Sequence, residues 1–191
     1  MSGLAIAILA AGKARRFGGG KLDAPLAGKP LGRWALDTAR VLAPERLALV
    51  VGDPAPQFAR EAGCDLLVNH RAAEGLGTSA VLAAGWAAES ASDALLVLLA
   101  DMPLVAPETL ERLAGAALAG LPAAVAHSGR PGAPAAFPAR LFPALQALTG
   151  DAGAAQVLRG APDVLLIETS ANELRDVDRP EDLSEIAALL G

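Results

Sequence analysis

The chain has 191 residues, of which 53% are hydrophobic and 3% aromatic, and its formal net charge is −5. This length suits one domain with a substantial core, and the acidic balance argues against nucleic acid as a partner, because nucleic-acid-binding domains usually carry a basic surface. No apolar run approaches the roughly 20 residues of a membrane-spanning helix, so we expect no membrane partner. The single Cys64 excludes an intramolecular disulfide and a multi-cysteine metal site. The first residues lead into an apolar strand without a signal peptide, so we expect a cytoplasmic protein.

Short apolar runs alternate with longer amphipathic stretches along the chain. The predicted strands are residues 4–9, 47–51, 65–68, 94–100 and 164–167, and the predicted helices are residues 31–41, 54–61, 78–88, 107–119, 138–148 and 180–190. This alternation predicts an α/β fold with a mostly parallel sheet, helices on both faces, and ligands at the carboxyl ends of the strands. Residues 123–137 interrupt the alternation and are predicted as a small antiparallel insertion. No linker is visible, so residues 1–191 are expected to form one domain.

The segment after the first strand is rich in glycine and in basic residues. It carries Lys13, Arg15, Arg16 and Lys21 around a run of three glycines. Backbone N–H groups exposed by small residues, together with these cations, can cradle a triphosphate. The segment is neither a P-loop nor a dinucleotide fingerprint, because it lacks the Ser or Thr after the lysine and the third spaced glycine. A flexible, solvated basic loop is the alternative that the segment alone leaves open.

Acidic residues mark two further positions. Asp101 directly follows the apolar run 94–100, and Asp176 and Asp178 precede the last predicted helix. A carboxylate at the end of a buried strand can hold Mg²⁺, which takes oxygen ligands together with substrate phosphates. Local structure is the alternative in both places: Asp101 as a turn residue, and the later pair as favourable charges at a helix start.

Residues 69–79 combine glycines with hydroxyl side chains just before a predicted helix. Such a segment could contact a base or ribose, or it could cap the helix. His70 and His127 are isolated from other catalytic residue types. The sequence therefore indicates neither a Ser–His–Asp triad nor a zinc site.

Taken together and in order, these segments resemble the MobA-like nucleotidyltransferases, most closely the molybdenum cofactor cytidylyltransferases. The first loop is similar to the family pattern L-A-A-G-x-x-x-R-[M/F]-G-x-x-K-L, residues 101–103 to D-M-P, and residues 176–183 to D-[V/I]-D-T-P-E-D-L. Residues 69–79 are similar to the family's nucleotide-contact segment. Several matches in the same order are far more specific than any one of them.

The acceptor side of the resemblance contains two departures. Residues 132–134 and 148–154 are similar to the patterns G-H-P and L-x-G-D-x-G-A-R, but Ala133 stands where the family usually has His. Ala155 stands where it usually has Arg. The resemblance is therefore stronger for the NTP-binding half than for the acceptor-binding half.

The resemblance implies a Rossmann-like domain that transfers CMP from CTP to a molybdopterin-type phosphate and releases pyrophosphate. Arg16, Lys21 and Asp101 would be catalytic, and Asp101 and Asp178 would hold Mg²⁺. The nucleotide-binding residues that it implies are Leu9, Ala10, Ala11, Gly12, Lys21, Asn69, Gly75, Gly77 and Ser79.

Base choice, acceptor and partner have alternatives at this stage. Ala11 favours CTP, because guanylyl-transferring relatives typically have Gly at this position, and a Cβ beside the base narrows the pocket against a purine. A related transferase would use GTP, or a sugar phosphate or alditol phosphate acceptor. A non-catalytic protein would instead bind the nucleotide or cofactor and deliver it. The resemblance also implies a molybdoenzyme or a chaperone as a protein partner.

Overall fold

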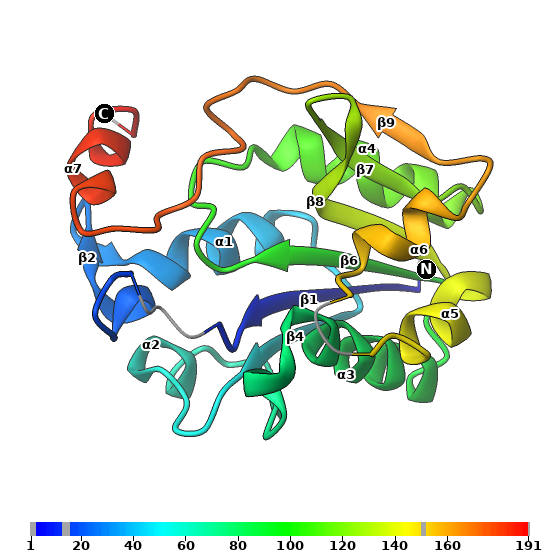
Figure 1. Cartoon of the computed structure of the whole chain (residues 1–191), viewed down its shortest axis with the longest axis horizontal. Helices are drawn as coiled ribbons and strands as arrows, with labels where there is room; N and C mark the ends of the chain where they lie inside the picture. The colour runs from blue at the N-terminus through cyan, green and yellow to red at the C-terminus, as the bar shows by residue number, and fades with distance from the viewer. Residues whose placement is uncertain (1–2, 13–15, 150–151, 191) are drawn as a thin grey trace.

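A seven-stranded sheet organises the fold. The computed structural model describes residues 3–12, 16–149 and 152–190, and the strand order of its main sheet is β5-β4-β1-β6-β8-β7-β9 (Figure 1). The strands are β1 (Leu4–Ala10), β4 (Arg46–Val51), β5 (Asp65–Val68), β6 (Ala94–Leu99), β7 (Ala123–His127), β8 (Arg130–Pro138) and β9 (Leu165–Ile167). Neighbouring strands are parallel, except that β8 lies antiparallel to both β6 and β7. The predicted mostly parallel, Rossmann-like α/β architecture is therefore confirmed.

Helices cover both faces of this sheet. They are α1 (Leu31–Val41), α2 (Gln57–Arg60), α3 (Leu76–Glu89), α4 (Pro107–Leu118), α5 (Phe142–Gln146), α6 (Ala155–Arg159) and α7 (Asp182–Ala187). The first, second and fourth pack against one face, and α3, α5 and α6 against the other (Figure 1). The last helix, α7, lies beside β2 at the edge of the molecule. Within the described residues, no helix combines the length and apolarity needed to cross a bilayer.

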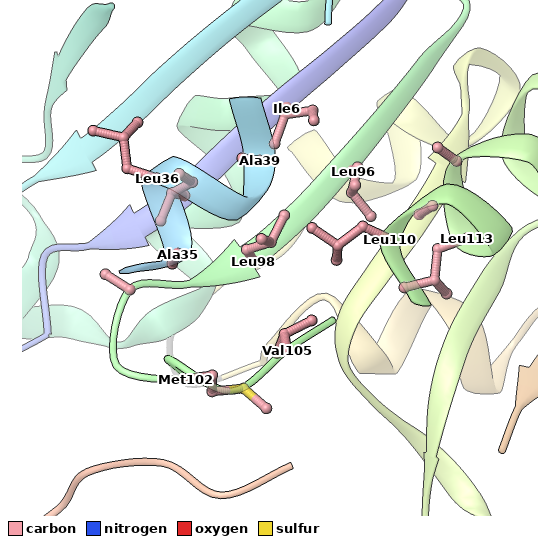
Figure 2. Close-up of a cluster of buried hydrophobic side chains, with 14 of the residues drawn as sticks. Ile6, Ala35, Leu36, Ala39, Leu96, Leu98, Met102, Val105, Leu110 and Leu113 are labelled. Carbon is pink, nitrogen blue, oxygen red and sulfur yellow. The ribbon is translucent and has the colours of Figure 1, made fainter. Parts of the chain in front are cut away.

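The two faces are packed by separate clusters of buried side chains, because successive residues of a strand point to opposite sides. On one face, Ile6 of β1 and Leu98 of β6 lie in the core with Leu36 of α1 and Leu110 of α4 (Figure 2). On the other face, Ala5 and the next odd-numbered residues of β1 share a core with alanines of α3. The alanines of β1 and α3 let helix and sheet approach closely on this face, beside larger side chains such as Leu95 and Phe137.

The antiparallel segment differs from its prediction in one respect. Residues 123–137 do form an antiparallel pair, β7 and β8, but β8 also pairs with β6 and so belongs to the main sheet. A separate small antiparallel sheet is formed instead by β2 (Pro25–Leu26) and β3 (Lys29–Pro30). The sequence did not predict this pair, because two residues per strand leave no hydrophobic alternation to detect.

Prolines explain where two predicted helices are shorter than expected. Residues 54–61 were predicted as helical, but α2 begins only at Gln57, since a residue that precedes a proline, here Ala55 before Pro56, avoids the helical conformation. Residues 138–148 were also predicted as one helix. Pro138 instead ends β8, and α5 begins at Phe142 after a 3-10 turn. Helix α6 was not predicted from the sequence.

Packing of Phe58 on Gly32 gives the first testable prediction. A Cβ built on Gly32 in α1 would lie only 2.4 Å from the Phe58 ring of α2, and Phe58 is buried. We expect Gly32→Ala to lower the free energy of unfolding by about 1–3 kcal/mol, as overpacking of a filled core does. The measurement is urea denaturation followed by circular dichroism.

Gly115 provides the matched control. It is an exposed glycine within α4, and a Cβ at this position would meet nothing within 4 Å. Gly115→Ala should therefore raise stability by about 0.5–1 kcal/mol, because alanine loses less conformational freedom than glycine in a helix. Equal effects of the two substitutions would contradict the packing role of Gly32.

Candidate active site

A cavity of about 720 Å³ opens at the carboxyl ends of β1, β4 and β6. Strand β1 lies between the other two, so the cavity spans the width of three neighbouring strands, which are about 4.8 Å apart. Its volume lies within the range that small-molecule sites occupy. The residues that line it are Leu9, Ala10, Ala11, Gly12, Arg16, Gly19, Gly20, Lys21, Leu22, Asp23, Gly52, Asp53, Pro54, Ala55, Pro56, Leu76, Leu99, Asp101 and Asp178.

An ion pair joins the loop after β1 to the end of β6. The Lys21 Nζ lies 2.6 Å from the Asp101 Oδ2, and the two side chains are only 11% and 23% exposed. Lys21 follows Gly18–Gly20, which have φ angles of 86°, 101° and 63°. Only glycine adopts such a run of positive φ angles without strain. The glycine run therefore turns the chain so that Lys21 reaches Asp101.

A second ion pair lies at the mouth of the cavity. The Arg16 Nη1 is 2.6 Å from the Asp178 Oδ2, but these side chains are 72% and 45% exposed. Solvent screens such a pair, so it contributes little stability. Its importance lies in its position, because both residues line the cavity with the Lys21–Asp101 pair.

The backbone around Asp178 is fixed by its neighbours. The Val177 side chain is fully buried among residues of β2, α1 and α7, and its N–H donates to the carbonyl of Asp101 at 3.0 Å. The Asp182 Oδ2 accepts the N–H groups of Asp178 and Arg179 at 2.8 and 2.7 Å. The Arg179 N–H holds the pKa of Asp182 below its ordinary value, so the carboxylate that fixes this turn is ionised at neutral pH.

Two carboxylates beside the cavity fit a divalent cation. Asp101 and Asp178 each hold a cationic group at 2.6 Å, which shows that positive charge is favoured at both positions. Burial, and then the Asp101 charge, raises the pKa of nearby Asp176. No group of three or more His, Cys, Asp or Glu side chains in the described ranges could enclose a metal. Mg²⁺ suits such a site, because it commonly takes one or two carboxylates and completes its shell with substrate phosphates and water.

Comparison with known proteins identifies the family. Residues 6–168 match the family described as the MobA-like NTP transferase domain. This chain belongs to that family. MobA-like proteins are nucleotidyltransferases, so this chain is a nucleotidyltransferase. The family assignment confirms the predicted resemblance to the MobA-like nucleotidyltransferases, while the closer resemblance to the cytidylyltransferases stays a prediction.

Individual relatives of this MobA-like chain include both sequences and structures. It is 35% identical over 193 residues to the purine catabolism protein PucB of Bacillus subtilis, covering 91% of each chain. It resembles the Rv0371c complex with manganese from Mycobacterium tuberculosis, with TM-score 0.75, 22% identity and coverage of 97% and 98% of the two chains. It also resembles the molybdopterin-guanine dinucleotide biosynthesis protein A of Archaeoglobus fulgidus, with TM-score 0.69, 19% identity and coverage of 97% and 98%. The two structural likenesses establish the fold.

The predicted site residues divide into those that line the cavity and those that do not. Arg16, Lys21, Asp101, Asp178 and residues 9–12 all line it. Four predicted nucleotide contacts lie outside its lining: Asn69, Gly75, Gly77 and Ser79. Their role in nucleotide binding stays a prediction. Lys13, Arg15, Gly150 and Asp151 lie outside the described residues.

Asn69 instead organises the loop before α3. Its buried side chain donates to the hydroxyls of Thr78 and Ser79 at 2.9 Å, and its Oδ1 accepts the Arg71 N–H at 2.9 Å. This network directs the start of α3 toward the cavity, where Leu76 forms part of the wall. These hydrogen bonds give Asn69 a role in holding the loop against the first turn of α3, but no side chain caps the N-terminus of that helix.

Asp23 is a site residue that the sequence reading missed. Its Oδ1 accepts the Phe58 N–H at 2.8 Å, and its Oδ2 accepts the Gln57 N–H at 2.9 Å. The carboxylate thereby caps α2 from a distant part of the chain and ties the loop after β1 to the start of that helix, directly after the lining residues 52–56. No local sequence signal marks it, because its partners are more than 30 residues away.

Asp23→Asn tests whether both carboxylate oxygens of Asp23 are needed to cap α2. The amide keeps one acceptor oxygen but turns an NH₂ group toward the second N–H, so we expect a loss of about 1 kcal/mol in unfolding free energy. Asp182→Asn is the matched control, since a single oxygen of Asp182 accepts both of its N–H groups and the amide oxygen can do the same. Urea denaturation measures both variants. A loss for Asp182→Asn as large as for Asp23→Asn would contradict the assignment.

Proposed function

We propose that this nucleotidyltransferase moves CMP from CTP to the phosphate of a molybdopterin-type acceptor and releases pyrophosphate, with Mg²⁺ as its cofactor. The observation that supports this most is the Lys21–Asp101 pair, which joins a glycine-rich loop to a strand-end carboxylate at the cavity. Nucleotidyl transfer uses cations to stabilise phosphate charge and carboxylates to hold a metal ion, and Lys21 and Asp101 bring one group of each kind to the cavity. The molybdopterin part rests on the motif resemblance.

Positioning and charge stabilisation account for the reaction. An acceptor phosphate oxygen attacks the α-phosphorus of CTP, a new P–O bond forms, and the bond to the β-phosphate breaks. The acceptor phosphate is already an anion, so no general base has to remove a proton. Lys21 and Arg16 stabilise the charge on the α-phosphate and on the departing pyrophosphate. Mg²⁺ held by Asp101 and Asp178 would neutralise phosphate oxygens.

Substrate binding exchanges ion-pair partners in this proposal. Without ligand, Asp101 neutralises Lys21, which is 11% exposed and would otherwise be a costly unpaired charge. With ligand, Lys21 and Arg16 would pair with phosphate oxygens, and Asp101 and Asp178 would then be available to hold Mg²⁺. The cations and carboxylates of the site therefore compensate one another in the ligand-free protein.

Ala11 supports CTP as the nucleotide. It is 8% exposed, lines the cavity at the end of β1, and its carbonyl lies 3.8 Å from the position of a Cβ built on Gly52. A methyl group here narrows the pocket beside the base. A purine is larger than a pyrimidine, so the narrowed pocket disfavours GTP more than CTP. One methyl group in a pocket is worth about 1–3 kcal/mol, or roughly 10–200-fold in specificity.

The test is a pyrophosphate-release assay with CTP and GTP and a molybdopterin-type acceptor. We expect the wild-type kcat/KM for CTP to exceed that for GTP, and Ala11→Gly to shift the ratio toward GTP, because it removes the only side-chain atom at this position. A wild-type preference for GTP would contradict the cytidylyl assignment. Pyrophosphate release only with a sugar or alditol phosphate would replace the acceptor, and no release with any NTP would favour a delivery protein.

A further inference from the structure

Four carboxylates line the cavity, and three of them are engaged. Asp101 and Asp178 pair with Lys21 and Arg16, and Asp23 accepts two backbone N–H groups. The fourth, Asp53, is 68% exposed, and its nearest recorded partner within the described residues is the His70 Nδ1 at 3.8 Å. That distance exceeds a hydrogen bond. Within the described residues, Asp53 is thus the lining carboxylate whose oxygen atoms accept no hydrogen bond from the protein. They are available to accept one from a ligand.

The strand order places Asp53 on the far flank of the cavity from Asp101. Asp53 follows β4 and Asp101 follows β6, with β1 between them, so two strand spacings of about 4.8 Å each separate the two strand ends. The phosphates are bound at the Lys21 and Asp101 flank in the proposed function. A nucleotide that extends across the end of β1 then brings its base to the flank of Asp53.

The surroundings of Asp53 suit the edge of a base. Pro54, Ala55 and Pro56 directly follow Asp53 in the lining of the cavity, and Leu76, a large apolar side chain that is 47% exposed, lines the same cavity. Apolar walls with a few polar groups are typical of ligand pockets, where the polar groups set orientation and specificity. Asp53 is the charged acceptor next to these walls.

We propose that Asp53 is a specificity-determining residue that accepts a hydrogen bond from the exocyclic amino group of cytosine and so discriminates CTP from UTP. The inference rests on the proposed function and deepens it. An ionised carboxylate only accepts hydrogen bonds. Cytosine presents an amino donor at position 4, whereas uracil presents a carbonyl acceptor there, which the carboxylate repels. In this proposal, Ala11 limits the size of the base that fits, and Asp53 accepts a hydrogen bond from the group at position 4 of the base.

The experiment measures dissociation constants by isothermal titration calorimetry for CTP, UTP and the triphosphate of 2-pyrimidinone riboside, which lacks a substituent at position 4. Each titration contains Mg²⁺ and no acceptor. We expect wild-type affinity to fall in the order CTP, 2-pyrimidinone, UTP, with CTP at least about tenfold tighter than UTP, the scale of one hydrogen bond to a charged group. In Asp53→Asn the ratio should fall to within about threefold, because an amide can either donate or accept.

The ratio of the CTP and UTP affinities distinguishes recognition of the base from a general effect of charge on triphosphate binding. Removal of one negative charge near a triphosphate strengthens the binding of both nucleotides and leaves their ratio unchanged. Glu111→Gln, which removes a charge from the exposed surface of α4, is the matched control and should keep the wild-type ratio.

Two results would overturn the inference while CTP still binds: equal wild-type affinities for CTP and UTP, or an unchanged ratio in Asp53→Asn. Failure of both pyrimidine nucleotides to bind, or tighter binding of GTP than of CTP, would instead overturn the proposed cytidylyl function together with the inference. The two failures give different binding patterns and are therefore distinguishable.

Discussion

The Lys21–Asp101 ion pair is the contact on which the site depends. It is mostly buried, and it connects the loop after β1 to the loop after β6. The Asp101 carbonyl also accepts the Val177 N–H, which brings the segment with Asp178 to the same place. Three stretches of chain that lie far apart in sequence thus converge on one aspartate. A charge held this far from solvent must be compensated, so the ligand-free site is neutralised by its own cations.

The sheet provides the rigid base for this arrangement. Strands β1 and β6 are parallel and in register from Leu4 and Ala94 onward, so their carboxyl ends finish side by side. Buried side chains on both faces hold these strands between two helical layers, and Figure 2 shows part of the cluster on the face that α1 and α4 cover. The residues that line the cavity extend from this base largely on loops, outside the packed core.

The sequence predicted elements whose signals are local. The helix 31–41 and the strand 65–68 agree with α1 and β5 at both ends, because each has a clear apolar pattern and a clear boundary. Lys21 stood out because glycine and basic residues are concentrated in one loop, and residues 9–12 were predicted from the motif resemblance. The partners of Asp23 and the acceptor capacity of Asp53 were not predictable, since both depend on which distant segments the fold brings together.

Metal-dependent binding of CTP tests the central claim that charges are exchanged at this site. A ligand that binds only the folded protein raises its melting temperature. We predict a clear rise in the wild-type melting temperature with millimolar CTP and Mg²⁺. The rise should be much smaller with CTP and EDTA, because the carboxylates then lose their cations to the phosphates without gaining a metal ion. It should also be much smaller with Mg²⁺ alone, because the cations then lose their carboxylates without gaining a phosphate. An equal rise with CTP in Mg²⁺ and in EDTA, or no rise with CTP and Mg²⁺, would contradict the account.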